Sequence, residues 1–366
     1  MYTAPRAARG PLRGAQHGTE ARLTGNSINV TGGVEIESRR FDVLGIGNAI
    51  VDVITQAEDA FLLENGLAKG AMTLIDAPTA EGLYGRMGAA VESSGGSAAN
   101  TIAGLSALGG RGAFIGKVRN DQLGGIFAHD IRALGVDFTT AAATAGEPTA
   151  RCLIFVTNDA QRTMQTFLGA SATLGPDDID EAAVRAAAVT YLEGYLWDPP
   201  PAKKAFEKAA TIAHDAGNMV ALSLSDAFCV DRHRADFLRL VEGHVDILFA
   251  NETEIMSLYQ VDRFDDALQH VRGHCRVAAL TRSEKGSVIV AGDEVHVVDA
   301  APVAKVVDTT GAGDLYAAGF LFGLSQRRSL QECGRIGAVC AGEIISHYGA
   351  RPETPLLPLV QKALAG

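Results

Sequence analysis

The sequence has few cysteines and none in a paired motif. Only five occur in 366 residues, they lie far apart, and no two have the CxxC spacing. An odd number of scattered cysteines argues against a disulfide framework and against a paired-cysteine metal or redox site. We therefore expect buried free thiols and a cytoplasmic protein.

Long apolar runs and clusters of basic residues are missing as well. Arg335 and Glu343 interrupt the longest apolar pattern, near the C-terminus, so no segment reaches the length that spans a bilayer. Lys and Arg number 32 against 43 Asp and Glu, a formal net charge of −11, and no basic cluster suggests nucleic-acid binding. We expect a small-molecule partner, with no nucleic acid and no membrane.

Residues 1–40 lack the periodic pattern of a helix or a strand. They are rich in Gly, Arg, Ala and Thr, which predicts a disordered N-terminal extension. A transit peptide is the alternative, but serine is scarce and no amphipathic helix is evident. Organised sequence runs over residues 41–360.

The densest motif lies near the C-terminal end, within Val306–Phe320. Its core, Asp308-Thr-Thr-Gly-Ala-Gly-Asp314, reads as a turn that feeds a helix. The glycines allow a close backbone approach, and the N–H groups of the first helical turn form an anion hole. Asp314 in that turn can take a proton from a hydroxyl group. An ordinary helix start is the alternative, but it needs one capping residue and not this density of Asp, Thr and Gly.

A second dense motif occupies residues 93–109. Gly95 and Gly96 allow a tight backbone approach, Ser97 starts a helix, and Asn100 lies one turn along, facing the glycines. Close helix packing would explain Ser97 alone, but not Asn100 together with the double glycine. We therefore predict that these residues contact a ligand.

The first strand is predicted from the apolar run Phe41–Ile54. Two polar residues, Asn48 and Asp52, interrupt its second half. In an open parallel sheet the carboxyl ends of the strands form the ligand-binding edge. A buried Asp52 needs a partner, and ligand hydroxyl groups are a natural one.

A small lid is predicted from two insertions, at about 52–76 and 138–170. The strands 152–157 and 162–167 flank the turn Asn158-Asp-Ala-Gln161, which is typical of a hairpin. We expect Arg162 to supply a cation from the lid, and Phe167 to be the aromatic residue nearest the substrate. The alternative for Phe167 is an ordinary core position.

Regular alternation of strands and helices begins after Leu174 and predicts the fold class. We expect an α/β fold with a doubly wound, mostly parallel sheet flanked by helices, together with the small β-sheet lid. The elements predicted from the pattern are helix 177–187, strand 189–197, helix 202–216, strand 219–225, helix 231–242 and strand 245–250.

The two dense motifs resemble the two signatures of the PfkB family, the ribokinase-like sugar and nucleoside kinases. The resemblance covers residues 41–360 and implies that Asp314 is the catalytic base. It also implies that the amides of Gly311, Ala312 and Gly313 bind the transferring phosphoryl group. The sugar-binding residues that it implies are Asn48, Asp52, Gly95, Gly96, Ser97 and Asn100.

The resemblance further implies ATP as co-substrate and Mg2+ as cofactor. Asn251 and Glu254 fit the NxxE motif that organises magnesium and its waters around the ATP phosphates, although a capped helix would read the same way. Thr281 and Gly286 match a segment of the ATP site, where Arg282 departs from the family pattern. Relatives often bind a monovalent cation at the signature loop, which points to K+ near Asp308 and Thr310.

The substrate is predicted from several short segments, among them GNAIVDVI, KGAM and YLEGYLWDP, which resemble the adenosine-kinase-like branch of the family. A nucleoside needs an apolar slot beside the ribose, and Met72, Phe155 and Phe167 are the candidates to line it. We therefore predict phosphorylation of the 5'-hydroxyl of adenosine to AMP by a monomer or a homodimer. A free-sugar kinase of the ribokinase or fructokinase type is the first alternative, and a non-catalytic sugar- or nucleoside-binding regulator is the second.

Overall fold

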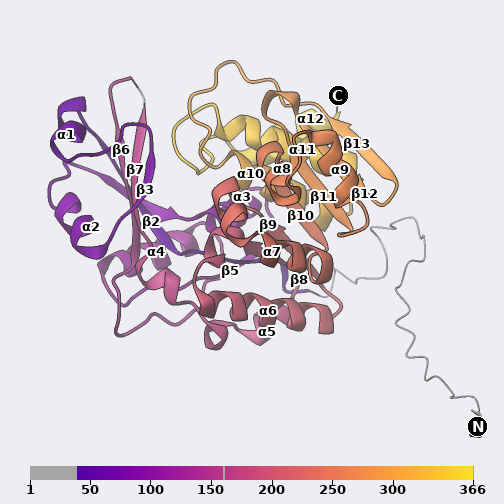
Figure 1. Cartoon of the computed structure of the whole chain (residues 1–366), viewed down its shortest axis with the longest axis horizontal. Coiled ribbons are helices and arrows are strands. Elements are labelled where there is room, and N and C mark those ends of the chain that lie inside the picture. Colours follow the sequence, from indigo (N-terminus) through magenta and orange to yellow (C-terminus); the bar gives the residue numbers. More distant parts are fainter. Residues whose placement is uncertain (1–38, 160, 366) are drawn as a thin grey trace, which may run out of the picture.

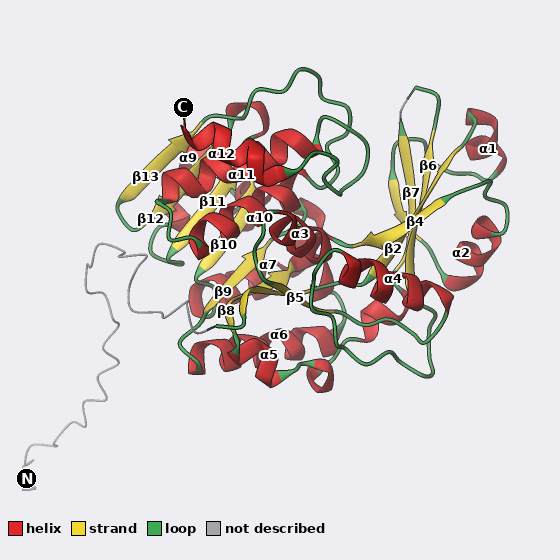
Figure 2. Cartoon of the chain, turned by 180° about the vertical axis from the view of Figure 1, so that it is seen from behind, coloured by secondary structure: helices red, strands yellow, loops and turns green. Residues whose placement is uncertain are grey.

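The structure is a computed structural model that describes residues 39–159 and 161–365. Two sheets of very different size organise the chain (Figures 1 and 2). The predicted N-terminal extension falls almost entirely outside the described residues. No helix within the described ranges is long and apolar enough to cross a membrane.

The large sheet has eight strands and is mostly parallel, as predicted. From one edge to the other its strands are β13 (Glu294–Val298), β12 (Ser287–Ala291), β11 (Val277–Thr281), β10 (Ile247–Asn251), β9 (Met219–Ser223), β8 (Ala187–Glu193), β1 (Phe41–Ile46) and β5 (Gly112–Ile115). The strands from β11 to β5 run parallel, and β12 and β13 add an antiparallel edge. The sheet places the carboxyl ends of six strands along one side, where polar residues gather.

Helices cover both faces of this sheet, which makes it doubly wound. One face packs against α3 (Ser97–Ala107), α4 (Gln122–Ala133), α10 (Ala312–Ser325), α11 (Leu330–Ile344) and α12 (Leu356–Ala365). The other packs against α5 (Glu181–Arg185), α6 (Pro200–Asp215), α7 (Ala227–Gly243), α8 (Glu252–Tyr259) and α9 (Phe264–Val271). Alternate residues of one strand enter the two cores; Phe249 faces the first and Leu248 the second.

The small sheet and two helices form a unit that we call the lid. Its strands lie in the order β3 (Met72–Leu74), β7 (Arg162–Phe167), β6 (Ala150–Val156), β2 (Ile50–Gln56) and β4 (Val91–Gly95), and its helices are α1 (Asp59–Glu64) and α2 (Ala77–Tyr84). The helices cover one face: the rings of Phe61 and Phe155 are 5.1 Å apart, and Arg151 donates to Glu81. The opposite face carries Asp52 and Arg162 by strand alternation and faces the larger domain (Figure 1).

The run predicted as a single first strand is two strands in two different sheets. β1 is buried along its whole length, whereas β2 alternates between buried and partly exposed residues. The chain leaves the large sheet between Gly47 and Ala49 and enters the lid. The change in pattern follows from the environment, because β1 has helices on both faces and β2 has helices on one.

Three of the predicted element boundaries are wrong. The helix expected over 177–187 is a 3-10 turn, Pro176–Asp178, followed by α5, because Asp180 caps a new helix by accepting from the N–H of Ala183 at 3.1 Å. The strand expected to run to 197 ends at Glu193, where Gly194 packs against the backbone of β9 and starts a 3-10 turn. α7 begins earlier than predicted, after the cap Asp226.

Candidate active site

Asp314 lies in the first turn of α10 and is held by two side chains from α3. The hydroxyl of Ser97 donates to Oδ1 at 2.6 Å, and Nδ2 of Asn100 donates to Oδ2 at 2.9 Å. Burial raises the pKa of Asp314, and the two hydrogen bonds act against this rise. The structure therefore brings together the two dense motifs, more than 200 residues apart in the sequence, around one carboxylate.

The signature loop turns sharply before α10. Gly311 has a φ of +78°, and a Cβ there would lie 2.9 Å from Cβ of Ala350. Within the described residues the N–H groups of Gly311 and Gly313 make no hydrogen bond to another residue, whereas the N–H of Ala312 donates to the carbonyl of Thr309 at 3.2 Å. Two of the three predicted anion-binding amides are thus free, and a Cβ at Gly313 would meet only open space.

Asp52 lies near the start of β2, where the chain enters the lid. Burial raises its pKa to about 6, and the charges of Arg351 and Arg162 act in the opposite direction. A Cβ at Gly95 would lie 2.5 Å from the Asp52 carboxyl group, so this glycine makes room for the carboxylate. The two predicted residues are thus neighbours, and Asp314 is close enough to raise the pKa of Asp52 further.

Asn48 is buried and its side chain is used inside the protein. Nδ2 donates to Oε1 of Glu193 at 2.6 Å, and Oδ1 accepts from the hydroxyl of Ser171 at 2.9 Å. Gly96, with a φ of +98°, packs against the carbonyl oxygen of Asn48. These two predicted substrate-binding residues build the junction between the lid and the large sheet.

Sequence reasoning missed two charged residues at the site, Glu193 and Arg351. Glu193 ends β8, and burial raises its pKa to about 7. The guanidinium of Arg351 donates to the carbonyls of Ser94 and Ala99, and its pKa is lowered by burial. An acidic residue inside the apolar strand pattern around Tyr191 was the available signal for Glu193. Arg351 gave none, since its partners are about 250 residues away.

Arg162 extends from the lid to the signature loop and forms an ion pair with Asp308. Both side chains are almost fully buried. Asp308 also accepts hydrogen bonds from the N–H groups of Thr310 and Gly349, both at 3.0 Å, and from the Thr310 hydroxyl at 2.7 Å. The side chains of Asp308 and Thr310 are thus engaged with the protein, and a K+ ion here would depend on backbone oxygens.

Asn251 and Glu254 form the reciprocal cap of α8. The N–H of Glu254 donates to Oδ1 of Asn251, and the N–H and Nδ2 of Asn251 donate to the Glu254 carboxylate. Burial raises the pKa of Glu254 to about 7, with smaller contributions from Asp226 and Asp314. Asn251 and Glu254 therefore do cap a helix. This does not exclude that Glu254 also holds water bound to magnesium, because a carboxylate accepts about four hydrogen bonds.

The predicted ATP residues Thr281 and Gly286 flank a turn between β11 and β12. Thr281 ends β11 beside Asn251, at the ligand-binding edge. Gly286 has a φ of +81° and lies against the carbonyl of Val298, which explains the glycine by backbone geometry. Arg282 makes an ion pair with Glu252 at 3.0 Å.

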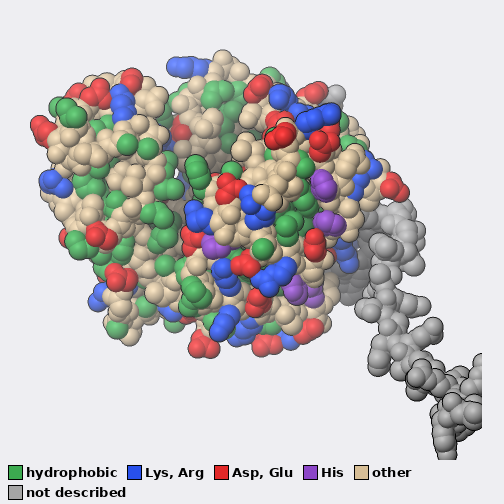
Figure 3. All heavy atoms as spheres, in the orientation of Figure 1, with side chains coloured by type: hydrophobic (Ala, Val, Ile, Leu, Met, Phe, Trp, Pro, Cys, Tyr) green, Lys and Arg blue, Asp and Glu red, His purple; other side chains and the backbone are tan. Residues whose placement is uncertain are grey.

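The three residues expected to line an apolar slot do not lie together. Met72 is 49% exposed and lies on the face of the lid that carries Asp52 and Arg162 and faces the larger domain, which we call the cleft-facing side. Phe155 and Phe167 are buried and, by strand alternation, lie on the face covered by α1 and α2. The cleft-facing side instead carries Leu74 beside Met72, and Leu74 is 55% exposed. Figure 3 shows hydrophobic side chains at the lid surface.

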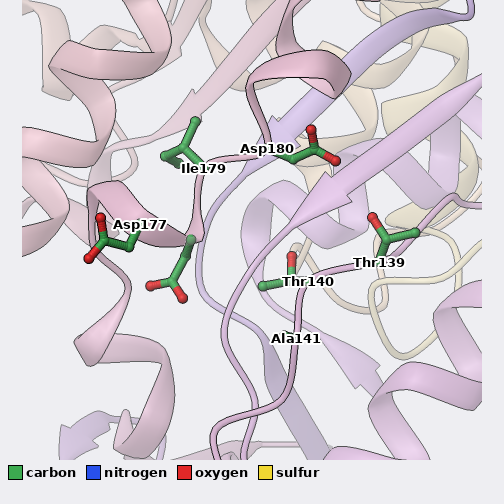
Figure 4. A pocket seen from close by; sticks show the side chains of 7 residues that line it. Thr139, Thr140, Ala141, Asp177, Ile179 and Asp180 are labelled. Carbon is green, nitrogen blue, oxygen red and sulfur yellow. The ribbon is translucent and has the colours of Figure 1, made fainter.

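A pocket elsewhere contains none of the predicted residues. It is lined by residues 139–141 and 177–180 (Figure 4). It holds three aspartates, and within the described part of the chain no group of three His, Cys, Asp or Glu side chains is placed to hold a metal. We assign this pocket no function.

Comparisons with known proteins show the family of this chain. Residues 70–356 match the model of the pfkB family of carbohydrate kinases. The adenosine kinase from Sinorhizobium meliloti is 55% identical, with a TM-score of 0.82 over 88% of this chain and 99% of that chain. A probable sugar kinase from Rhizobium etli is 53% identical, with a TM-score of 0.83 over 89% of this chain and 99% of that chain. The probable fructokinase-4 of Arabidopsis thaliana is 28% identical over 297 residues, 75% of this chain and 89% of that protein.

The chain therefore belongs to the PfkB family of carbohydrate kinases. It is a phosphotransferase that acts on a sugar or a nucleoside with ATP as co-substrate. The predicted fold class is confirmed. The cytoplasmic location, the choice between monomer and homodimer, and K+ stay predictions.

Proposed function

We propose that this protein is an adenosine kinase that transfers the γ-phosphoryl group of ATP to the 5'-hydroxyl of adenosine. The observation that carries the proposal is the Asp314 carboxylate, held by Ser97 and Asn100 beside free amides of the signature loop. The choice of adenosine is supported by the 55% identity to the adenosine kinase from Sinorhizobium meliloti.

The ribose is proposed to bind between Asp52 and Asn100. The Oδ1 atom of Asn100 is buried and lacks a hydrogen-bond partner among the described residues, and a buried acceptor of this kind calls for a donor. A ribose hydroxyl supplies one, and the Asp52 carboxylate accepts from another. The base then contacts the apolar cleft-facing side of the lid, where Met72 and Leu74 are exposed.

Asp314 acts as general base in the proposed mechanism. Two of the roughly four acceptor positions of its carboxylate are used by Ser97 and Asn100, and the others are available to the substrate hydroxyl. The raised pKa makes it a stronger base than a solvated aspartate. The Gly311 and Gly313 amides and the first turn of α10 stabilise the charge on the transferring group, and Arg162 supplies a cation once it leaves Asp308.

Two acidic residues, Glu254 and Asp226, fit a magnesium ion that binds mainly to the ATP phosphates. Glu254 and Asp226 are near one another, and with no three-carboxylate cluster in the described ranges they would act through water. The ion would neutralise phosphate charge.

The first prediction concerns pH. Asp52 in its ionised form accepts from the ribose, and its pKa is raised to about 6, so adenosine affinity should be constant at higher pH and fall as the pH drops through about 6. Titration calorimetry with adenosine in the absence of ATP measures this without the protonation of ATP itself. An affinity that is flat from about pH 5 to about pH 8 would contradict the assignment of Asp52.

The second prediction concerns the substrate. Steady-state kinetics with ATP–Mg should give adenosine a kcat/KM at least about 10²-fold above inosine, guanosine, ribose and fructose. The two nucleosides carry an oxo group in place of the 6-amino group of adenosine, and the two sugars lack the base. A higher kcat/KM for ribose or fructose would establish the free-sugar kinase, which the fructokinase relative keeps as the second candidate. Tight binding without turnover of any of the five would favour the regulator.

A further inference from the structure

Glu193 is a buried carboxylate that accepts three hydrogen bonds within the protein. Oε1 accepts from the backbone N–H of Asn48 at 3.2 Å and from its Nδ2 at 2.6 Å, and Oε2 accepts from the N–H of Ala98 at 2.8 Å. Gly47 packs so closely that a Cβ there would lie 2.4 Å from Oε2. All three hydrogen-bond partners are donors, so both oxygens of this carboxylate act as acceptors inside the protein.

Glu193 and its partner Asn48 join three segments of the chain. In each of these segments the chain passes from one sheet to the other. Asn48 lies where the chain passes from β1 to β2, and Ala98 follows the return from β4 to α3. Ser171 lies where the chain leaves β7, and its hydroxyl is within hydrogen-bond distance of Oδ1 of Asn48, at 2.9 Å, and of the carbonyl oxygen of Leu168, at 2.5 Å. Glu193 itself ends β8, an interior strand of the large sheet that lies between β9 and β1. One network thus fixes three connections of the lid to the large domain.

The same network ends at Ala98, the residue next to Ser97, which holds the candidate base. Ala98 follows Ser97, whose hydroxyl donates to Asp314, and Asn100 lies in the same first turn of α3. The capping residue of α3 is Gly96, which has no side chain to cap the turn. The Glu193 carboxylate takes that part by accepting from the N–H of Ala98.

We propose that Glu193 is a positioning residue of the phosphotransfer reaction. It holds the first turn of α3 so that Ser97 and Asn100 meet Asp314, and through Asn48 it sets this turn relative to the lid. Its side chain is buried and both oxygens accept from the protein, so the role that we assign to it is to position other residues. The inference rests on the proposed function, since it takes Asp314 to be the base.

The variant Glu193→Gln tests the role of the carboxylate with little change in shape. The NH2 of the glutamine would face either the N–H of Ala98 or the Nδ2 of Asn48. Both of these are donors, so one hydrogen bond would be replaced by two donors facing each other. We expect kcat for adenosine to fall by at least about tenfold, because small displacements of a reacting group reduce the rate strongly. Hydrogen exchange of the first-turn amides of α3 should become faster, and this readout needs no substrate.

The exchanged pair Asn48→Asp with Glu193→Gln is the matched control. The carboxylate introduced at position 48 can accept from the glutamine NH2 group, and the glutamine oxygen can still accept from the N–H of Ala98. Only the backbone N–H of residue 48 loses its acceptor, so the recovery should be partial. We expect this double variant to regain at least about half of the activity lost in Glu193→Gln, on a logarithmic scale. Asn48→Asp alone places two carboxylates together, and its kcat should be lower than that of Glu193→Gln and that of the double variant.

The outcomes separate the positioning role from the proposed function. Wild-type turnover and its loss in Asp314→Asn decide the proposed function first. With those in hand, unchanged kcat and unchanged exchange in Glu193→Gln overturn the inference, as does a double variant no better than the product of the single effects. If Glu193→Gln does not fold, the double variant decides: folded and active supports the inference, and folded but inactive overturns it.

Discussion

Replacing Asp314 by Asn is expected to reduce kcat with adenosine by about 10³-fold, the range for loss of a positioned general base. Asn is similar in size and can still accept a hydrogen bond from Ser97 or Asn100, but it cannot take the proton of the 5'-hydroxyl. The KM values for adenosine and ATP should change little. Steady-state kinetics with the exposed-loop variant Asp293→Asn as the matched charge control measures the effect.

Stability provides a second readout for the same variant. The raised pKa of Asp314 means that the folded protein favours the protonated carboxyl group. The associated stability is present below the unfolded-state pKa and is lost as the pH rises through the folded-state pKa. At neutral pH the ionised carboxylate therefore costs stability, and Asp314→Asn should melt at the same or a higher temperature. A variant that loses activity and melts well below the wild type would point to misfolding.

The second large effect is expected for Asp52→Asn. The kcat/KM for adenosine should fall roughly 10²-fold, since a hydroxyl-binding carboxylate is replaced by a neutral group, and the KM for adenosine should account for much of the loss. Asp130 offers a matched control: it is a second carboxylate near Arg351, but it accepts from the N–H of Ser94. Equal losses of kcat/KM in Asp52→Asn and Asp130→Asn would show that the effect comes from the lost charge near Arg351. Such a result would contradict a contact between Asp52 and the ribose.

The sequence predicts the fold class well because the alternation of strands and helices reflects burial. It could not show that the first apolar run changes sheets between Gly47 and Ala49, since both halves are apolar and only their periodicity differs. It also placed Phe155 and Phe167 beside the substrate. Which face of a strand meets the larger domain depends on register with strands elsewhere. Here Phe61 of α1 packs against Phe155, and strand alternation places Phe167 on the same face.

The candidate site divides in a similar way. Asp314 in one motif, and Ser97 and Asn100 in the other, could be singled out because each motif concentrates residues that one local structure does not require. That they belong to one site was implied only by the resemblance to the two PfkB signatures, and the structure joins them by hydrogen bonds. Glu193 and Arg351 could not, because each acts through backbone groups of segments that are distant in the sequence. Asn251 and Glu254 show the limit of motif reading, since the same side chains satisfy the cap of α8.

The central claim is phosphotransfer from ATP to the 5'-hydroxyl of adenosine at the Asp314 site. The most direct measurement is phosphorus NMR of the products formed with adenosine, run in parallel with 5'-deoxyadenosine, which lacks only the acceptor oxygen. We predict ADP and AMP in equal amounts from adenosine and no phosphorylated nucleoside from 5'-deoxyadenosine. A phosphorylated 5'-deoxyadenosine, or ADP formed without AMP in the presence of adenosine, would contradict the account.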